Sequence, residues 1–537
     1  MGTVQRPNRL ILLVILGLSA VLAACSSGGG KGGSSSGNRD TIPDSFTLTT
    51  PSGVDPTKVG FGTAVVSAPV KITGINAPAP VSIQGGEFKI ESGGFTSTAS
   101  TISNGQSIQV RVQTPIKAEQ TATAILTIGG IEASFTVTTG PDTTPPEVSI
   151  LFPPPASMTE GQTLFVRGTV KDVHGALEDG AITVNGVEAE LELNETKDEG
   201  TWSVTVDLQP GENIVEVTAI DVAKNANEED KPSVRSRRVE SIVGESFPDN
   251  ENPFSSVFKV DIGFFDNELL AFVTDDSRQR PGVFAVNLAT GKRTLVANNQ
   301  GVEDELKFYE PQSIHFGENG KLYVSDYSSA IFEIDLANFD RKKLAEKGNG
   351  SYASGPLGMF LLEKTLFVAD ERRVYAVNVD TAEQLLVSSA NEKIPDAQNP
   401  FDDIWGLTYE DGSIFVADYN GVIFSVDRTT GMRTLLSQLE LTSTAVVDLA
   451  KGPQDGELIY LNRSSSQLGI YKFDIFSGKS ELLSSSQSPD SINSPREVWG
   501  VSVHPSGGYL LLIDRARKAV YAVDMQQGYR VVISKSL

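Results

Sequence analysis

The sequence predicts an all-β protein in which two β-sandwiches are followed by a six-bladed β-propeller. Residues 41–245 contain short stretches that alternate apolar and polar residues, which is the pattern of half-buried strands. Residues 254–537 repeat a four-strand pattern six times. That repeat contains no segment of helical period of useful length. We therefore expect sheets without a covering layer of helices.

The composition is that of a globular, turn-rich and strongly acidic chain. Among 537 residues, 39% are hydrophobic, and 50 glycines and 27 prolines are available for turns. The formal net charge is −24. Nucleic-acid binding needs a basic stripe that meets the phosphates, and the sequence offers none. No nucleic-acid partner is therefore expected.

The first 24 residues are predicted to form a secretory signal peptide. Arg6 and Arg9 precede an apolar run of 14 residues, ILLVILGLSAVLAA, and a basic start with a short apolar core is typical of export signals. The run is too short for a good transmembrane helix. The mature chain is therefore expected outside the cytoplasm.

The single cysteine, Cys25, follows this run directly. The stretch LAAC at residues 22–25 resembles the bacterial lipobox, and the resemblance implies cleavage before Cys25 and attachment of lipid to it. The next residue is Ser26 and not aspartate. In enteric-type bacteria this resembles the default signal that sends a lipoprotein to the outer membrane. We expect a lipid-anchored protein of the bacterial cell envelope, in the outer membrane. The alternative is an ordinary signal peptide with a chance cysteine.

Residues 25–40 are predicted to form a tether because they are rich in glycine and serine. Such segments behave as flexible coils, and this one has a reach of about 20 Å. The tether is expected to hold the folded domains near a membrane surface without placing them in it.

Residues 41–142 and 143–245 are each predicted to form a β-sandwich. Each contains six or seven strand-like stretches separated by turn residues, a density typical of sandwiches. The first passage, from VKITGINAPAP to QSIQVRV, resembles a bacterial surface module of the immunoglobulin-like kind. The second, with VRGTVKD, ITVNG, WSVTV and VTAIDVAKN, resembles the bacterial immunoglobulin-like repeats found beside secreted carbohydrate-active enzymes.

One turn of the second sandwich carries two polar side chains. Asp221 and Asn225 flank this turn, and such side chains hydrogen-bond nearby backbone. A calcium site is the less favoured alternative, because these residues and the acidic run at 228–230 do not make a spaced set of ligands.

The repeat in residues 254–537 has a period of about 48 residues. In each copy an apolar strand is preceded by one strand and followed by a second and, in most copies, a third. The six central segments are LLAFVTD (269–275), KLYVSD (321–326), TLFVAD (365–370), SIFVAD (413–418), LIYLN (458–462) and YLLLID (509–514). Such units cannot bury both faces alone, and stacking them radially into a closed ring solves this problem.

The pattern of strand, Asp, turn and strand resembles the NHL and gluconolactonase-like propellers. The resemblance implies a fold, since propellers carry many functions. Gluconolactonase-like relatives hold a divalent metal with a Glu, an Asn and an Asp at the channel. No glutamate opens the first blade here in the matching way, and the asparagine has no clear counterpart. The sequence therefore predicts no metal ligand and no cofactor.

Asp418 and Asp427, which end neighbouring strands of the fourth copy, could be read as a two-carboxylate site. Their counterparts recur around the repeat, however. The first set is Asp275, Asp326, Asp370, Asp418, Asn462 and Asp514, and the second is Asn287, Asp335, Asn378, Asp427, Asp474 and Asp524. A sixfold feature is spread around a ring, and Asp or Asn after a strand commonly bonds turn backbone. We therefore interpret both residues as architectural.

Ligands of propellers usually lie at one mouth of the central channel, where the innermost strands begin. These starts are at 310–313, 354–358, 402–406, 443–445 and 496–500. The candidate ligand-binding residues are Gln312, Asp402, Asp403, Trp405, Arg496 and Trp499. Aromatic rings at a polar mouth can stack on a sugar or a peptide side chain. The favoured alternative for the two tryptophans is that they plug the channel or pack between blades. Arg496 with Glu310, Asp402 or Asp403 could likewise be a polar ring that satisfies itself.

Catalysis is poorly supported by the sequence, and no catalytic residue is predicted. His174, His315 and His504 are the only histidines, and none has the HExxH spacing of a metal site. His315 and His504 fall near corresponding positions of the second and sixth copies, so we interpret both as framework. The sequence also contains no GxSxG elbow.

Three functional hypotheses remain open. The favoured one is a membrane-anchored envelope lipoprotein whose propeller binds a protein or glycan partner, with the immunoglobulin-like domains as spacers. The alternative is a metal-dependent lactonase-type hydrolase of the gluconolactonase-like kind. A purely structural role in the surface layer is the third.

Overall fold

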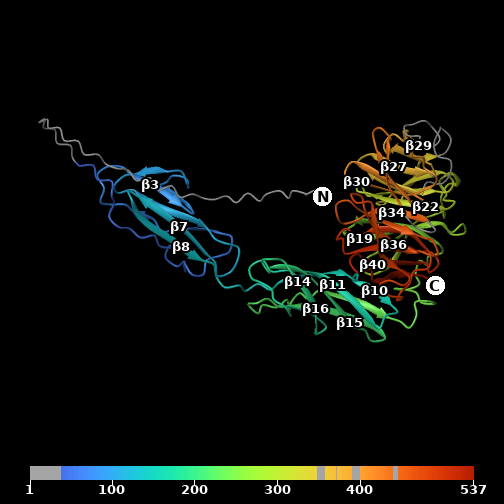
Figure 1. Cartoon of the computed structure of the whole chain (residues 1–537), viewed down its shortest axis with the longest axis horizontal. Helices are drawn as coiled ribbons and strands as arrows, with labels where there is room; N and C mark the ends of the chain where they lie inside the picture. Colours follow the sequence, from blue (N-terminus) through green and yellow to red (C-terminus); the bar gives the residue numbers. More distant parts are fainter. Residues whose placement is uncertain (1–37, 347–356, 371, 390–398, 440–444) are drawn as a thin grey trace, which may run out of the picture. The chain divides into compact units, whose positions relative to one another are not determined.

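The computed structural model describes residues 38–346, 357–370, 372–389, 399–439 and 445–537. The predicted fold class is confirmed: the chain forms two immunoglobulin-like β-sandwiches followed by a six-bladed β-propeller (Figure 1). The only helical element of the described ranges is one 3-10 turn, η1 (Asp304–Leu306). Cys25, the signal peptide and most of the tether lie outside the described residues.

The first sandwich is a compact unit with its own core. Its two sheets have the orders β1-β6-β2, with β4 also paired to β6, and β5-β3-β7-β8. The strands are β1 (Ala64–Val66), β2 (Val70–Lys71), β3 (Ala79–Gln84), β4 (Glu87–Ile90), β5 (Ser100–Ile102), β6 (Ser107–Gln113), β7 (Thr121–Ile128) and β8 (Ile131–Thr138). Alternate residues of β7 and β8 are buried, as expected for strands with one face on a core.

The second sandwich packs a four-stranded sheet, β14-β15-β11-β9, against the sheet β13-β12-β16-β17-β10. Its strands are β9 (Glu147–Phe152), β10 (Ala156–Thr159), β11 (Thr163–Lys171), β12 (Ile182–Val184), β13 (Val187–Glu188), β14 (Glu190–Leu193), β15 (Glu199–Asp207), β16 (Gly211–Ala219) and β17 (Ser233–Arg238). Trp202 is 2% exposed, and its indole N–H donates to the carbonyl of Thr169 at 3.1 Å. It is a core residue, as the sequence indicated.

The propeller consists of six blades, each built from four consecutive antiparallel strands. The first three blades are β18 (Val257–Phe265), β19 (Glu268–Asp275), β20 (Gly282–Asn287) and β21 (Arg293–Asn298); β22 (Pro311–Gly317), β23 (Lys321–Asp326), β24 (Ala330–Asp335) and β25 (Arg341–Glu346); and β26 (Gly358–Leu362), β27 (Thr365–Asp370), β28 (Arg373–Asn378) and β29 (Gln384–Ser389). The last three are β30 (Ile404–Glu410), β31 (Ser413–Asp418), β32 (Val422–Asp427) and β33 (Arg433–Gln438); β34 (Val446–Lys451), β35 (Glu457–Asn462), β36 (Gly469–Asp474) and β37 (Lys479–Ser485); and β38 (Val498–Val503), β39 (Tyr509–Asp514), β40 (Ala519–Asp524) and β41 (Arg530–Lys535).

The ring closes because the inner strand of the first blade, β18, lies beside the inner strand of the last, β38. The sixth blade takes all four strands from the C-terminal end of the chain, so closure needs no exchange of a strand between the chain ends. The backbone N–H of Phe254 donates to Ser536 Oγ at 2.7 Å and joins the two ends of the ring.

The second sandwich and the propeller form one compact unit with a continuous sheet. Strand β10 pairs in parallel with β17 on one side and meets β41 of the sixth blade in antiparallel fashion on the other. The outer edge of that blade is therefore covered, which removes an exposed strand edge. In Figure 1 the label β10 marks this teal strand beside the red strands of the sixth blade.

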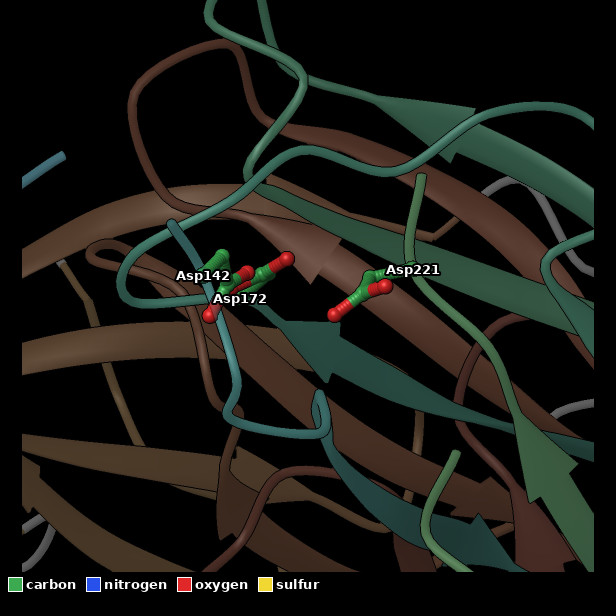
Figure 2. Close-up of side chains that lie close together, drawn as sticks. All are labelled: Asp142, Asp172 and Asp221. Carbon is green, nitrogen blue, oxygen red and sulfur yellow. The ribbon is translucent and has the colours of Figure 1, made fainter. Parts of the chain in front are cut away.

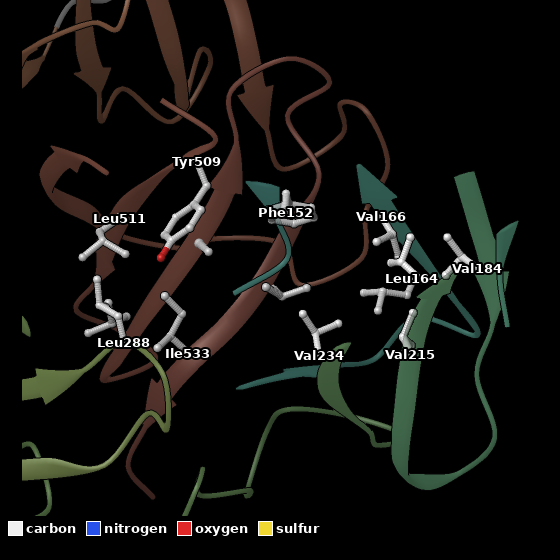
Figure 3. Packing of buried hydrophobic residues seen from close by; sticks show 14 of the residues in the cluster. Phe152, Leu164, Val166, Val184, Val215, Val234, Leu288, Tyr509, Leu511 and Ile533 are labelled. Carbon is white, nitrogen blue, oxygen red and sulfur yellow. The ribbon is translucent and has the colours of Figure 1, made fainter. Parts of the chain in front are cut away.

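A shared hydrophobic cluster continues from the second sandwich into the first and last blades (Figure 3). Phe152 and Val234 from the sandwich belong to the same cluster as Tyr509 and Ile533 from the sixth blade. The ring of Phe165 stacks on Tyr529 with centroids 4.6 Å apart. Burial of this apolar surface holds the two domains together.

No helix within the described ranges is long and apolar enough to cross a membrane.

Candidate functional site at the propeller channel

The aspartates that end the second strand of the blades hold the backbone that leads into the inner strand. Asp418 is 2% exposed and accepts the backbone N–H groups of Asp402 (2.6 Å), Asp403 (3.2 Å) and Asn420 (3.2 Å). Asp275, Asp326 and Asp514 also accept three such N–H groups each, and Asn462 accepts two. Burial raises the pKa of Asp418, and the three N–H donors oppose that shift in part. The architectural interpretation of Asp418 is confirmed.

The second set of repeated residues caps the next turn on the opposite face of the ring. Asp427 accepts the N–H groups of Thr429 (3.0 Å) and Thr430 (2.7 Å). The corresponding side chains of Asn287, Asp335, Asn378, Asp474 and Asp524 accept N–H groups from the residues just after them. These are Asx turns, so Asp427, like Asp418, holds turn backbone in place.

The channel is lined by three tiers of residues, which occupy matching positions of the six inner strands. The mouth tier lies at the start of each strand, where most of the pairings contain a bulge. Its members are Phe258, Gln312, Leu357, Trp405, Val447 and Trp499. Three of the predicted ligand-binding residues therefore lie in one ring, namely Gln312, Trp405 and Trp499.

The two tryptophans meet inside this mouth. Their ring centroids are 5.6 Å apart, and Trp499 also lies 4.7 Å from Phe258. Trp499 is 6% exposed, whereas Trp405 is half-buried. The indole N–H groups donate to the carboxylates of Asp403 at 2.8 Å and Glu497 at 3.0 Å, each two residues back in the chain. The three packed rings form a plug at this face of the channel, and of the three only Trp405 has a sizeable part of its surface in water.

Arginines surround the plugged mouth. The guanidinium of Arg463 lies 4.0 Å from the Trp499 ring centroid and that of Arg515 lies 5.7 Å away, within the range of cation–π attraction. Arg515 also pairs with Asp276 at 2.9 Å. The mouth thus combines aromatic rings with fixed positive charge.

Asp402 and Arg496 lie on the rim rather than in the channel. The Asp402 carboxylate is exposed and pairs with Arg372 at 3.0 Å. Glu310 pairs with Arg278. Arg496 is exposed, and its backbone N–H donates to Asp514. A polar rim is therefore present, but Arg278 and Arg372 supply the cations that the sequence analysis had assigned to Arg496.

A buried ion pair lies directly below the plug, in the middle tier of the channel. This tier consists of Lys259, Ser313, Gly358, Gly406, Asp448 and Gly500. Lys259 Nζ is 2.7 Å from Asp448 Oδ1 and donates to the carbonyl of Val447 at 2.7 Å. Burial lowers the pKa of Lys259 and raises that of Asp448, and the partner charge opposes each shift. The pair links the first and fifth blades across the sixth.

Glycine at this level lets the inner strands approach closely. A Cβ on Gly500 would lie 2.9 Å from Lys259 Cα, and one on Gly406 would lie 2.7 Å from the backbone nitrogen of Leu449. Both distances are shorter than real Cβ contacts. Because Gly500 has no side chain, the side chain of Lys259 can extend past it to Asp448.

The lower tier carries a second polar group. Its members are Asp261, His315, Phe360, Thr408, Ala450 and Ser502. His315 Nδ1 is 3.0 Å from Asp261 Oδ2, and Ser502 Oγ donates to Asp261 Oδ1 at 3.1 Å. Burial alone would raise the pKa of Asp261, but the bond and charge of His315 and two backbone N–H groups outweigh it and lower the pKa. Together with the middle tier, this group lines a cavity of about 230 Å³.

The strand register corrects the interpretation of the two histidines. His315 matches Ser502 and not His504, because His315 pairs with Tyr323 and Ser502 pairs with Leu511. His315 therefore faces the channel. His504 follows β38 and stacks on Tyr509 with centroids 4.3 Å apart.

Lys259, Asp261 and Asp448 are not recognisable as site residues in the sequence, because each looks like the polar residue of an alternating strand. The signal that reveals them is their place in the repeat. Lys259 and Asp448 fall where Gly358, Gly406 and Gly500 stand in three other blades. Among the described residues, the carboxylates and imidazole of the channel do not converge as a three-ligand metal group. Residues 354–356 and 443–444, which precede two inner strands, lie outside the described residues.

The fold and the channel define a β-propeller protein with immunoglobulin-like domains. A family model described as glucodextranase, domain B, matches residues 146–233, which is the second sandwich. No curated protein matches the chain.

Solved structures with similar folds share little sequence with this chain. A chain of a nidogen/laminin complex is 12% identical, with a TM-score of 0.36, and the match covers 54% of this chain and 98% of that one. A structural-genomics protein of unknown function from Bacteroides thetaiotaomicron is 14% identical, with a TM-score of 0.39 and coverage of 72% and 98%. Virginiamycin B lyase from Staphylococcus aureus is 13% identical, with a TM-score of 0.37 and coverage of 52% and 84%. At these scores the likenesses carry no argument about activity or partner.

Proposed function

We propose that this chain is an outer-membrane lipoprotein, anchored by a lipid on Cys25, whose propeller binds a protein or glycan partner at the face that carries the plugged mouth. The first sandwich acts as a spacer, and the second braces the sixth blade. The membrane anchor rests on the sequence alone, from the resemblance of residues 22–25 to a lipobox.

The observation that supports binding is a pair of exposed tyrosines beside the mouth. Tyr309 precedes the inner strand of the second blade, and Tyr327 follows Asp326, so both lie on the face of Trp405. They are 49% and 54% exposed, with ring centroids 6.3 Å apart. Arg278 lies 5.6 Å from the Tyr309 centroid. Exposed tyrosine and arginine are enriched at binding hot spots, and tyrosine also stacks on sugars.

The test compares the double variant Tyr309→Ala/Tyr327→Ala with Phe476→Ala. Phe476 is 79% exposed and lies in the β36–β37 turn, on the opposite face. Glycan arrays and photo-crosslinking from position 309 in the cells that produce the protein report the two partner classes. Loss of the tyrosines is expected to weaken binding by about tenfold or more, whereas Phe476→Ala leaves it unchanged. Binding that survives deletion of residues 254–537 would assign the role to another domain.

The membrane anchor has an independent test. Cys25→Ala is expected to move the protein from the membrane fraction to the soluble envelope fraction. The same variant should keep partner binding, because the anchor lies far along the sequence from the propeller. Membrane association that persists in Cys25→Ala would contradict the lipid anchor.

A lactonase-type hydrolase is the second candidate, favoured by the polar cavity that holds Asp261 and His315. His315 also lines the opening at the opposite end of the channel, with Phe316 and Leu361, so a substrate would approach from there. Lactone hydrolysis and metal content of the purified protein, with His315→Ala as control, decide this. Lactone hydrolysis by protein that contains a bound divalent ion, if His315→Ala abolishes this hydrolysis, would establish the hydrolase and contradict a role in binding alone.

A further inference from the structure

Three aspartates from separate segments meet at one end of the second sandwich (Figure 2). Asp142 precedes β9, Asp172 directly follows β11, and Asp221 lies just beyond β16. One oxygen from each carboxylate lies within 4.8 Å of the other two. That limit equals twice the usual Ca–O distance of about 2.4 Å, so each pair of oxygens is close enough to share an ion.

The loops hold each carboxylate in place through its own backbone contacts. Asp142 Oδ1 accepts the N–H and hydroxyl of Thr144 at 3.0 and 2.7 Å. Asp172 Oδ1 accepts the N–H groups of His174 at 3.1 Å and Gly175 at 2.8 Å. Asp221 accepts the backbone N–H of Asn225 at Oδ1 and its side-chain N–H at Oδ2, both at 2.8 Å. The group is thus preorganised by bonds that use only one oxygen of Asp142 and of Asp172.

The second oxygens of Asp142 and Asp172 are buried and without a hydrogen-bond partner. Asp142 is 9% exposed and Asp172 is 1% exposed. Both unpartnered oxygens border the same space, because a Cβ on Gly175 would clash with each of them. Buried carboxylate oxygens without partners are costly, so this arrangement points to a ligand that satisfies them.

No ion pair with a lysine or arginine neutralises the three carboxylates within the described part of the chain. The cation that comes near is Lys117, whose Nζ donates to the carbonyls of Asp172 and Gly175 at 2.9 Å and pairs with Asp198 at 2.9 Å. Burial raises the pKa of Asp172, and the charges of Asp142 and Asp221 raise it further against two N–H donors.

We propose that Asp142, Asp172 and Asp221 bind one divalent cation, Ca²⁺ in preference to Mg²⁺. Three carboxylates are hard oxygen ligands. They come from three irregular segments, which suits the flexible coordination of Ca²⁺ better than the strict octahedron of Mg²⁺. The sequence offers calcium as an alternative only at Asp221 and Asn225, because Asp142 and Asp172 are distant in sequence and join the site through the fold.

By coordinating all three aspartates, the ion would link the segment before β9 to the loops that follow β11 and β16. Calcium binding is therefore expected to stabilise the second sandwich, since a ligand that binds only the folded state shifts the unfolding equilibrium. The site lies apart from the channel and needs no assumption about the partner of the propeller.

The experiment uses the full chain, stripped with EDTA and dialysed against metal-free buffer. Isothermal titration with CaCl₂ is expected to show one ion per chain with a Kd of about 10⁻⁵ to 10⁻³ M and weaker binding of MgCl₂. Asp172→Asn and Asp142→Asn are each expected to weaken binding by more than about a hundredfold, beyond the loss typical of outer-shell partners. The control Asp179→Asn, an exposed residue of the same loop, should keep wild-type affinity.

Thermal unfolding supplies the second readout. Calcium should raise the unfolding temperature of the wild type and of Asp179→Asn, and should leave that of Asp172→Asn unchanged. Without calcium, Asp172→Asn should unfold at a higher temperature than the wild type, because it removes a buried unpaired charge. The proposal is overturned if the wild type binds no divalent cation, which would assign the cluster to carboxyl groups that share a proton. It is also overturned if both variants keep calcium binding.

Discussion

Arg167 of the second sandwich forms a buried ion pair with Asp524 of the sixth blade. Arg167 is 8% exposed and Asp524 is fully buried. Arg167 also donates to the carbonyl of Gly508 at 2.6 Å. Asp524 is the sixth of the Asx-turn residues that repeat around the ring, and it alone of that set faces another domain in the described structure. Asp524, a residue of the blade repeat, is thus also part of the interface between the second sandwich and the propeller.

Loss of this pair should weaken the joint between the second sandwich and the propeller. Arg167→Met leaves the Asp524 charge buried without its partner, which typically reduces stability by about 3–5 kcal/mol. In calorimetry the wild type should show one transition for residues 139–537 together, and the variant should show two. Lys171→Met removes an exposed pair with Glu199 and should change stability by less than about 1 kcal/mol. A single unshifted transition in Arg167→Met would mean that apolar packing alone joins the domains.

Lys259 and Asp448 should contribute to the stability of the propeller only when both charges are present. Lys259→Met alone leaves Asp448 charged and buried, and we expect a loss of about 3–5 kcal/mol. Lys259→Met/Asp448→Leu replaces both charges and should recover most of that loss. Guanidinium unfolding followed by tryptophan fluorescence measures both. Lys364→Met, at an exposed pair with Asp380, is the matched control. A neutral Lys259→Met would show that the Asp448 pKa rises enough for it to take up a proton instead.

The sequence predicted the propeller well because its signal is repeated. Six copies of strand, Asp, turn and strand average out local ambiguity, and only a closed ring buries the faces of every copy. The repeat also explains why Asp418 could be recognised as architectural. A carboxylate that recurs around a ring at the same strand end has a local structural task, and the hydrogen bonds of Asp418 show what that task is.

The channel chemistry could not be predicted in the same way because it lies in the departures from the repeat. Lys259 and Asp448 are far apart in the sequence, and nothing in either strand indicates that they meet. Asp261 and His315 likewise occupy matching positions of neighbouring blades, where other blades have phenylalanine, threonine, alanine or serine. Aligning the copies by the terminal Asp of the second strand, and then comparing each position, is the step that would have found them.

The two aspartates of the fourth blade should differ sharply in their contribution to stability. Asp418→Ala leaves the N–H groups of Asp402, Asp403 and Asn420 without their acceptor in a buried place, and we expect a loss of about 3 kcal/mol or more. Asp427→Ala opens an exposed turn whose N–H groups can bond water, and should reduce stability by much less than Asp418→Ala. Guanidinium unfolding of both variants tests this. Equal losses would contradict the distinction between the two sets of turn residues.

Stability near pH 5 should depend on His504. Burial against Tyr509 lowers the pKa of His504 to about 4, compared with about 6.5 in an unfolded chain. Its Nδ1 accepts the Ser506 N–H at 3.1 Å, so protonation of Nδ1 would break that bond. The unfolded state therefore binds the proton first, and stability is lost as pH falls from about 6.5 towards about 4, and is fully present above that window.

His504→Asn should remove this acid sensitivity, because its amide oxygen can replace Nδ1 as the acceptor and does not titrate. We expect the difference in stability between wild type and variant to change by about 1–2 kcal/mol between pH 7 and pH 4, after allowance for the part of the ring in water. The buried blade aspartates titrate alike in both proteins, so the difference isolates His504. Parallel pH profiles for the two proteins would show that the imidazole of His504 takes up a proton as readily in the folded chain as in the unfolded one.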